Sequence, residues 1–143
     1  MPGAASLRKS QYYGHPRNQF WRLMGAVLGE NLREMDYRKR LAVLKKRGIA
    51  LWDVLASCRR EGSLDSDISD ERPNEIAKLI RETGVLAVFL NGGKAEAAFK
   101  RFAAEGLSAE IAVHRLPSSS PAHSGMTFDE KLLRWPLIGD YAR

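Results

Sequence analysis

The sequence feature that most constrains the fold is the apolar run at residues 85–90, Val-Leu-Ala-Val-Phe-Leu, which leads directly into Asn91-Gly92-Gly93. A continuous β-branched and apolar run of this length is typical of a strand that is covered on both faces. The glycines supply a turn. A helical stripe follows, formed by Ala95, Ala98, Phe99 and Phe102. The run therefore predicts a parallel βα unit and an α/β fold.

Two further short apolar segments, residues 49–52 and 111–114, predict strands on either side of this unit. Residues 59–70 are polar and predict a loop. Helical periodicity predicts four more helices. The first begins near Pro16 with the apolar stripe Phe20/Leu23/Met24/Val27/Leu28, and the second has the stripe Tyr37/Leu41/Leu44 and is closed by Gly48. The third starts at Asp70–Pro73 with the stripe Ile76/Leu79/Ile80, and the last follows a Thr127–Glu130 capping box with the stripe Phe128/Leu132/Trp135. Strands that alternate with helices predict helices packed on a short central parallel sheet, in one domain spanning 1–143.

Composition is that of an ordinary globular protein, and its basic charge permits a polyanion partner without requiring one. The 143 residues carry a net charge of +6, and the basic side chains concentrate in residues 1–22 and 33–47, although a solvated helix face would give the same pattern. Cys58 is the only cysteine, so we expect a reducing, cytoplasmic setting. The chain has neither a transmembrane run nor a signal-peptide pattern. The three histidines lack metal-ligand spacing, and nothing in the sequence demands an oligomer, so we expect a monomer.

The segment Gln11–Trp21 is rich in both aromatic rings and hydrogen-bonding groups. A site that stacks a flat ring and reads its polar edge needs this combination, which suggests a nucleobase. Phe20 and Trp21 fit the core, whereas Tyr12 and Tyr13 precede the helix and can line a pocket. The polar residues His15 and Asn18 belong either to that pocket or to the helix cap. Arg17, in the expected first turn, opposes the helix dipole and suggests a nearby anion.

Other candidate residues lie where strands of the expected sheet end. Asp53 is either a base-reading acceptor or a structural carboxylate. The loop from Leu116 to Gly125 is either an idle linker or a rigid, hydroxyl-rich segment that enters a DNA groove, through Ser118, Ser119, Ser120 and His123. The turn Asn91–Lys94 is most simply a tight strand-to-helix turn, with phosphate binding as the alternative.

Three segments resemble the uracil-DNA glycosylase superfamily, and most closely its hypoxanthine-DNA glycosylase branch, often called family 6. They are Tyr12–Asn18 with Phe20-Trp21, Leu51–Leu55 with the Ser57-Cys58 and Gly62–Ser66 that follow, and Leu116–His123. Their order and spacing agree with the branch across nearly the whole chain. The resemblance implies a uracil-DNA glycosylase-like three-layer α/β/α fold around a parallel sheet. It also implies hydrolysis of the N-glycosidic bond of a deaminated base flipped out of single- or double-stranded DNA, without a metal or cofactor.

The resemblance also implies roles for individual residues. Asn18 corresponds to the Asn implicated in catalysis, Asp53 reads the base edge, and Tyr12 or Tyr13 stacks on the base. His15 lies in the same first motif. Family members begin with a strand that ends in a Gly-Ser-Phe-Pro-Gly-like turn, and residues 1–7 match only the second half of it. We therefore expect the first strand to be missing. This leaves three alternatives: a monofunctional glycosylase of hypoxanthine, uracil or xanthine, an inactive DNA-binding homologue, and a small nucleotide-binding protein.

Overall fold

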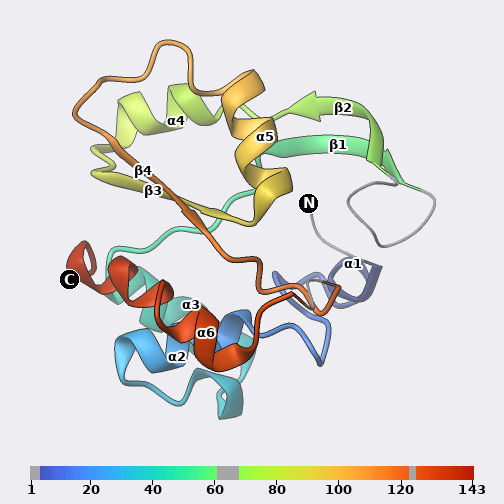
Figure 1. Ribbon diagram of the computed structural model, residues 1–143, viewed down its shortest axis with the longest axis vertical. Coiled ribbons are helices and arrows are strands. Elements are labelled where there is room, and N and C mark those ends of the chain that lie inside the picture. The colour runs from blue at the N-terminus through green and yellow to red at the C-terminus, as the bar shows by residue number, and fades with distance from the viewer. Residues whose placement is uncertain (1–3, 61–67, 123–124) are drawn as a thin grey trace. The chain divides into compact units, whose positions relative to one another are not determined.

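The computed structural model describes residues 4–60, 68–122 and 125–143, and these divide into two compact units (Figure 1). The first unit is Asp53–Leu116, and the second combines Pro2–Trp52 with Pro117–Arg143. The expectation of one domain over 1–143 stays a prediction. No helix in the described ranges is long and apolar enough to cross a membrane.

The first unit contains the parallel βα unit that the sequence predicts. Strand β3 (Ala87–Asn91) leads through helix α5 (Gly93–Phe102) to strand β4 (Ala112–Leu116), and the two strands pair in parallel from Ala87↔Ala112 to Asn91↔Leu116 (Figure 1). Helix α4 (Ile76–Thr83) precedes them and ends at Gly84, whose φ of 61° favours glycine. The expected strands at 85–90 and 111–114 are therefore confirmed, each displaced by one or two residues.

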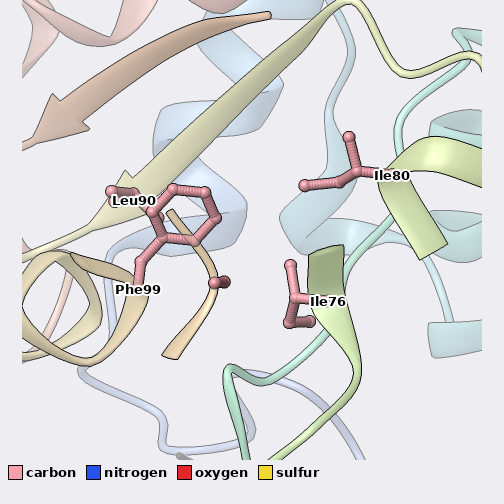
Figure 2. Close-up of a cluster of buried hydrophobic side chains, with 5 residues drawn as sticks. Ile76, Ile80, Leu90 and Phe99 are labelled. Carbon is pink, nitrogen blue, oxygen red and sulfur yellow. The ribbon is translucent and has the colours of Figure 1, made fainter. Parts of the chain in front are cut away.

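The core of this unit lies between the two helices and the strand pair. Figure 2 shows Leu90 of β3 and Phe99 of α5 facing Ile76 and Ile80 of α4, and Ala103 completes the buried cluster. The predicted inner face of α4 is thus confirmed for Ile76 and Ile80, while Leu79 is only half-buried. Apolar residues at helical spacing bury one stripe of each helix against the strands, which is how such a βα unit is stabilised.

Residues 49–52 form no strand, so that prediction is wrong. Gly48 has a φ of 72°, its N–H donates to the carbonyl of Lys45, and the Ile49 N–H donates to the carbonyl of Leu44. These bonds close the preceding helix in a Schellman motif, which commits the Ile49 N–H to the helix end. Trp52 is about half exposed (47%), so the segment is also not buried as a central strand would be.

The segment 59–70 contains strand residues where we predicted a loop, and no helix begins at Asp70–Pro73. Strand β1 (Leu55–Arg60) pairs antiparallel with strand β2 (Ile68–Pro73), with register shifts along the ladder, and α4 begins later, at Ile76. Strand β2 was not predicted because its sequence is polar. The Glu71 side chain, 12% exposed, is held by ion pairs with Lys94 and with Arg101, the latter at 3.6 Å between Nη1 and Oε2, rather than by apolar packing. Ion pairing of a strand carboxylate leaves no hydrophobic alternation to read.

The second unit is helical. Its elements are α1 (Ala4–Lys9), α2 (Phe20–Leu28), the 3₁₀ turn η1 (Leu32–Glu34), α3 (Tyr37–Lys46), α6 (Phe128–Leu132) and the 3₁₀ segment η3 (Trp135–Asp140). The capping box at Thr127 and Glu130 is confirmed. Helix α2 begins at Phe20 and not near Pro16, and α1 was not predicted. In α3, Leu44 is buried but Leu41 is 38% exposed, so the expected stripe is only partly an inner face.

Aromatic and apolar side chains of α2, η1, α3 and η3 form the core of the second unit. Phe20 packs edge-on against Trp21 at 4.9 Å and against Trp135 at 5.8 Å between ring centroids. The predicted core positions of Phe20 and Trp21 are confirmed, since both are 4% exposed. The remaining buried members are Leu23, Met24, Leu28, Leu32, Leu44 and Ile138. This core supports the segment that leads into α2.

Candidate functional site

The segment Gln11–Gln19 is a tightly tied turn in front of α2. The Gly14 N–H donates to Ser6 Oγ at 2.8 Å, and Ser6 is buried. Tyr12 is fixed at both ends of its backbone, since its N–H donates to Tyr37 Oη at 3.0 Å and its carbonyl accepts from Trp21 Nε1 at 3.2 Å. These bonds attach the backbone of the segment to α1, α2 and α3, so the side chains of the segment project from a backbone that is fixed in place.

His15 and Asn18 both accept backbone N–H groups two residues further on. His15 Nδ1 accepts from Arg17 at 3.1 Å, and Asn18 Oδ1 accepts from Phe20, the first residue of α2, at 2.9 Å. The capping interpretation is supported for Asn18, which bonds the first N–H of α2 from the position before the N-cap Gln19, but not for His15, whose bond lies in the turn before the helix. It is compatible with a second role for Asn18, because an amide has a second lone pair on its oxygen and two N–H donors.

The two tyrosines differ in how their rings are supported. Tyr13 adopts a φ of 55°, which is uncommon for a residue with a side chain, and its ring stacks on Phe20 at 3.8 Å with an interplanar angle of 17°. The Tyr12 ring is tilted by 42° from that of Tyr13 at 6.4 Å. Phe20 in turn packs on Trp135. The Tyr13 ring is thus backed by Phe20 in a stacked contact, and Phe20 is backed by Trp135 in an edge-on contact.

Arg17 lies outside α2, because the helix begins at Phe20. The expectation that this guanidinium opposes the helix dipole from the first turn is therefore wrong. Arg17 is exposed, as a phosphate contact requires, and its contact with DNA stays a prediction.

The loop after β4 is joined to the Gln11–Trp21 segment. The Gln19 N–H donates to the Ser119 carbonyl at 3.0 Å, and Trp135 Nε1 donates to the Pro117 carbonyl at 3.1 Å. Within the loop, Ser118 Oγ and Ser120 Oγ accept the N–H groups of residues 120 and 122. Ser119 is fully buried, so its side chain is not placed to meet DNA in this conformation. His123 lies outside the described residues. The two motifs that resemble the superfamily therefore meet in one unit.

Lys131 is a residue that the sequence prediction missed. It is 1% exposed, and its Nζ donates to Gln19 Oε1 at 2.8 Å. Burial lowers the pKa of Lys131 below the ordinary lysine value. One signal for this position existed: Phe128, Lys131, Leu132 and Trp135 have the spacing i, i+3, i+4 and i+7, so Lys131 stands within the helical stripe.

The other predicted residues belong to the first unit. Asp53 follows no strand, so the reasoning from a strand end is wrong; its side chain is half-buried and its carbonyl accepts from Asn74 Nδ2 at 2.8 Å. In the turn Asn91–Lys94, the Gly92 N–H donates to the carbonyls of Leu90 and Leu116, and Lys94 pairs with Glu71. These contacts favour the tight-turn interpretation over a phosphate site.

A surface hollow of about 480 Å³ lies beside α2, η1 and α6 in the second unit. Trp21, Arg22, Gly25 and Phe128 contribute to its lining, and the Arg22 guanidinium stacks over the Phe128 ring at 4.0 Å. Neither tyrosine of the segment lines it, nor does Asn18. The hollow is therefore separate from the predicted base site.

Comparison with known structures identifies the class of protein. The chain matches the solution NMR structure of a "putative Uracil DNA glycosylase" from Methanosarcina acetivorans with a TM-score of 0.78 and 37% identity, over 96% of this chain and 83% of that one. The uracil-DNA glycosylase-like α/β/α fold predicted from the sequence is thereby confirmed. No protein-family model matches the chain.

Two curated relatives narrow the class. The hypoxanthine DNA glycosylase of Methanosarcina acetivorans is 42% identical over 123 residues, which are 86% of this chain and 76% of the relative. That of Methanosarcina barkeri is 46% identical over 94 residues, which are 66% of this chain and 60% of the relative. The chain therefore belongs to the hypoxanthine-DNA glycosylase family of the uracil-DNA glycosylase superfamily.

Proposed function

We propose that the protein is a monofunctional DNA repair glycosylase that releases hypoxanthine, and to a lesser extent uracil or xanthine, from DNA. One observation carries the proposal. The hydrogen bond from Gln19 to Ser119 joins the polar aromatic segment Gln11–Trp21 to the serine-rich loop Pro117–Ala122, in a chain of this family. A base-binding turn and a DNA-contacting loop must act together in such an enzyme.

DNA binding would precede chemistry. Arg17 is exposed, and α1 ends in two basic residues, Arg8 and Lys9. Together with Ser118, Ser120 and His123, they would contact the phosphates on either side of the damaged nucleotide, as a monomer on single- or double-stranded DNA. Binding of this kind falls steeply as salt rises, because phosphate contacts release counterions. With one cysteine in the chain, a reducing cytoplasm suits the protein.

The flipped base would stack on a tyrosine. Tyr13 is the better supported platform, because Phe20 backs its ring at 3.8 Å and Tyr12 is tilted away from the same plane. Stacking of a base on such a ring contributes about 1–3 kcal/mol, against a cost of a few kcal/mol for unstacking. His15, also in this turn, would hydrogen-bond the polar edge of the base. A base-reading role for Asp53 rests on the family resemblance alone.

Hydrolysis would follow a dissociative course. The C1′–N bond breaks with its electrons passing to the base, the sugar develops oxocarbenium character, and water adds its oxygen to C1′ while its proton is lost to solvent. Asn18, held by the bond to the Phe20 N–H, would orient that water. An amide is a weak base, so the rate would come mainly from positioning and from electrostatic stabilisation of the sugar cation. No step requires a metal or a cofactor.

An excision assay tests this proposal. Labelled duplexes with one deoxyinosine, deoxyuridine or deoxyxanthosine, and an undamaged duplex, are incubated with the protein and then cleaved with alkali at abasic sites. We expect product from the deoxyinosine duplex above all, and none from the undamaged control. DNA binding without product would indicate an inactive DNA-binding homologue. Binding of free nucleotides with no salt-dependent DNA binding would indicate a nucleotide-binding protein.

A further inference from the structure

The buried amine of Lys131 has no part in the chemistry proposed above. It stands in a stripe otherwise made of Phe128, Leu132 and Trp135, and its residue is 1% exposed. Burial of an amine among apolar groups is costly unless it is hydrogen-bonded. An apolar side chain would fill the same place without that cost. The position of the amine therefore calls for a role other than packing.

The described contact of Lys131 is with Gln19, the residue next to Asn18. Nζ donates to Gln19 Oε1 at 2.8 Å, the Gln19 N–H donates to the Ser119 carbonyl at 3.0 Å, and the Gln19 carbonyl accepts from Leu23 in the first turn of α2 at 2.9 Å. Gln19 is thus held at its side chain and at both ends of its backbone. Each bond leads to a different element: α6, the serine loop and α2.

Helix α6 is itself firmly anchored at both ends. The capping box of Thr127 and Glu130 fixes its start, and Trp135, just beyond its end, donates to the Pro117 carbonyl at 3.1 Å. Because α6 is fixed at both ends, a side chain that is bonded to it is fixed as well. Because Lys131 lies between these two anchors, its amine fixes the place of Gln19 relative to the loop.

We propose that Lys131 is a positioning residue, which holds Gln19 so that the Asn18 turn and the Pro117–Ala122 loop keep one mutual geometry. The role rests on the proposed glycosylase function. It would act by keeping the water-orienting amide in place while the loop contacts DNA. A displacement of about 1 Å in such a group can cost up to about a hundredfold in rate.

This role predicts that stability and activity separate in Lys131→Met. The methionine reaches as far as the lysine Cε and lacks the buried amine, while Gln19, only half-buried, can hydrogen-bond to water instead. We therefore expect the melting temperature to stay the same or rise. A purely structural role predicts the reverse, a lower melting temperature with the excision rate per folded molecule unchanged.

The experiment compares wild type with Lys131→Met, Gln19→Leu, the double variant and Lys78→Met. Lys78 is an exposed residue of α4 in the other unit and controls for the substitution itself. Single-turnover excision from the deoxyinosine duplex, binding of the same duplex and hydrogen exchange of the Gln19 amide are measured for each. We expect Lys131→Met to lower the excision rate by about tenfold or more, to change the dissociation constant by less than about threefold, and to speed Gln19 exchange.

The double variant should be no slower than the worse single variant, because the bond between Lys131 and Gln19 is already lost in each single variant. Excision and Gln19 exchange in Lys131→Met at the level of Lys78→Met would overturn the positioning role while leaving the glycosylase intact. Additive losses in the double variant would also overturn it. A wild-type chain that releases no base would instead overturn the proposed function, and the positioning role with it.

Discussion

The contact of Asn18 with Phe20 allows its structural and catalytic roles to be separated. Asn18→Ala removes an acceptor that lies 2.9 Å from the first N–H of α2, and Phe20 itself is 4% exposed. Loss of such a cap costs about 1 kcal/mol. For a chain of this size, that lowers the melting temperature by roughly 3–4 °C. The change is small enough that the variant stays folded at assay temperature.

The expected loss of activity is much larger than that of stability. If Asn18 orients the water, Asn18→Ala should slow single-turnover excision of hypoxanthine by about 10²-fold or more, the size of effect seen when one preorganised polar group is removed from an active site. Asn18→Asp keeps an oxygen for the Phe20 N–H and adds a negative charge near the start of α2, so it should retain wild-type stability or exceed it slightly.

Asp36→Ala provides a matched control. Its carboxylate caps α3 by accepting from Lys39 at 3.0 Å, so its loss should destabilise the same unit by a similar amount. We expect the Asp36→Ala variant to excise hypoxanthine at the wild-type rate. The reasoning is refuted if Asn18→Ala loses the expected stability but excises within about threefold of Asp36→Ala, since Asn18 would then be a helix cap and nothing more.

Three further predictions concern other residues. Gly25→Ala should lower the free energy of unfolding by about 1–3 kcal/mol in urea titration, because a Cβ would lie 2.5 Å from the Glu30 carbonyl oxygen; wild-type stability would contradict the packing described. The hydrogen bond from Lys100, with the charge of Arg115, holds the pKa of Glu96 below its usual value. The stabilisation by the Glu96 carboxylate is therefore present above its unfolded-state pKa and is lost as pH falls through its folded-state pKa. Glu96→Gln should make the free energy of unfolding less dependent on pH in the acidic range. An unchanged pH dependence there would contradict this prediction. Borohydride should trap no covalent adduct with abasic DNA, since the buried Lys131 amine is bonded to Gln19; an adduct lost in Lys131→Met would show lyase chemistry.

The parts of the fold with clear hydrophobic periodicity could be predicted from the sequence. The run at 85–90, the capping box at Thr127 and Glu130, and the buried faces of Phe20 and Ile76 all follow local rules that the structure keeps. The family resemblance was likewise confirmed, because it rested on three motifs in order rather than on one. Local pattern and motif order are properties of the chain itself.

The errors have long-range causes. The strand expected at 49–52 fails because Ile49 gives its N–H to the end of α3, and apolar composition alone does not reveal that competition. The hairpin of β1 and β2 was missed because Glu71 is satisfied by Lys94 and Arg101, residues distant in sequence. These partners are set by tertiary structure, so no window of sequence contains the signal.

The candidate site shows the same division. The segment Gln11–Trp21 was identified from its composition. Its hydrogen bond to the loop after β4, from Gln19 to Ser119, was not predicted and is a finding of the structure. Burial of Ser119 could not be inferred, because hydroxyl side chains are normally exposed, and for Lys131 the only signal was its place in a helical stripe. Asp53 stays a prediction, since its proposed part in reading the base is independent of the strand that was expected before it.

Direct detection of the released base tests the central claim most closely. The wild-type protein is incubated with a deoxyinosine duplex, and both free base and uncleaved product strand are quantified by mass spectrometry before any alkali is added. The account predicts free hypoxanthine and an equal amount of full-length strand with one abasic sugar, sharply reduced in Asn18→Ala. Absence of free base, or release of the base as a nucleoside or nucleotide from a cut strand, would contradict it.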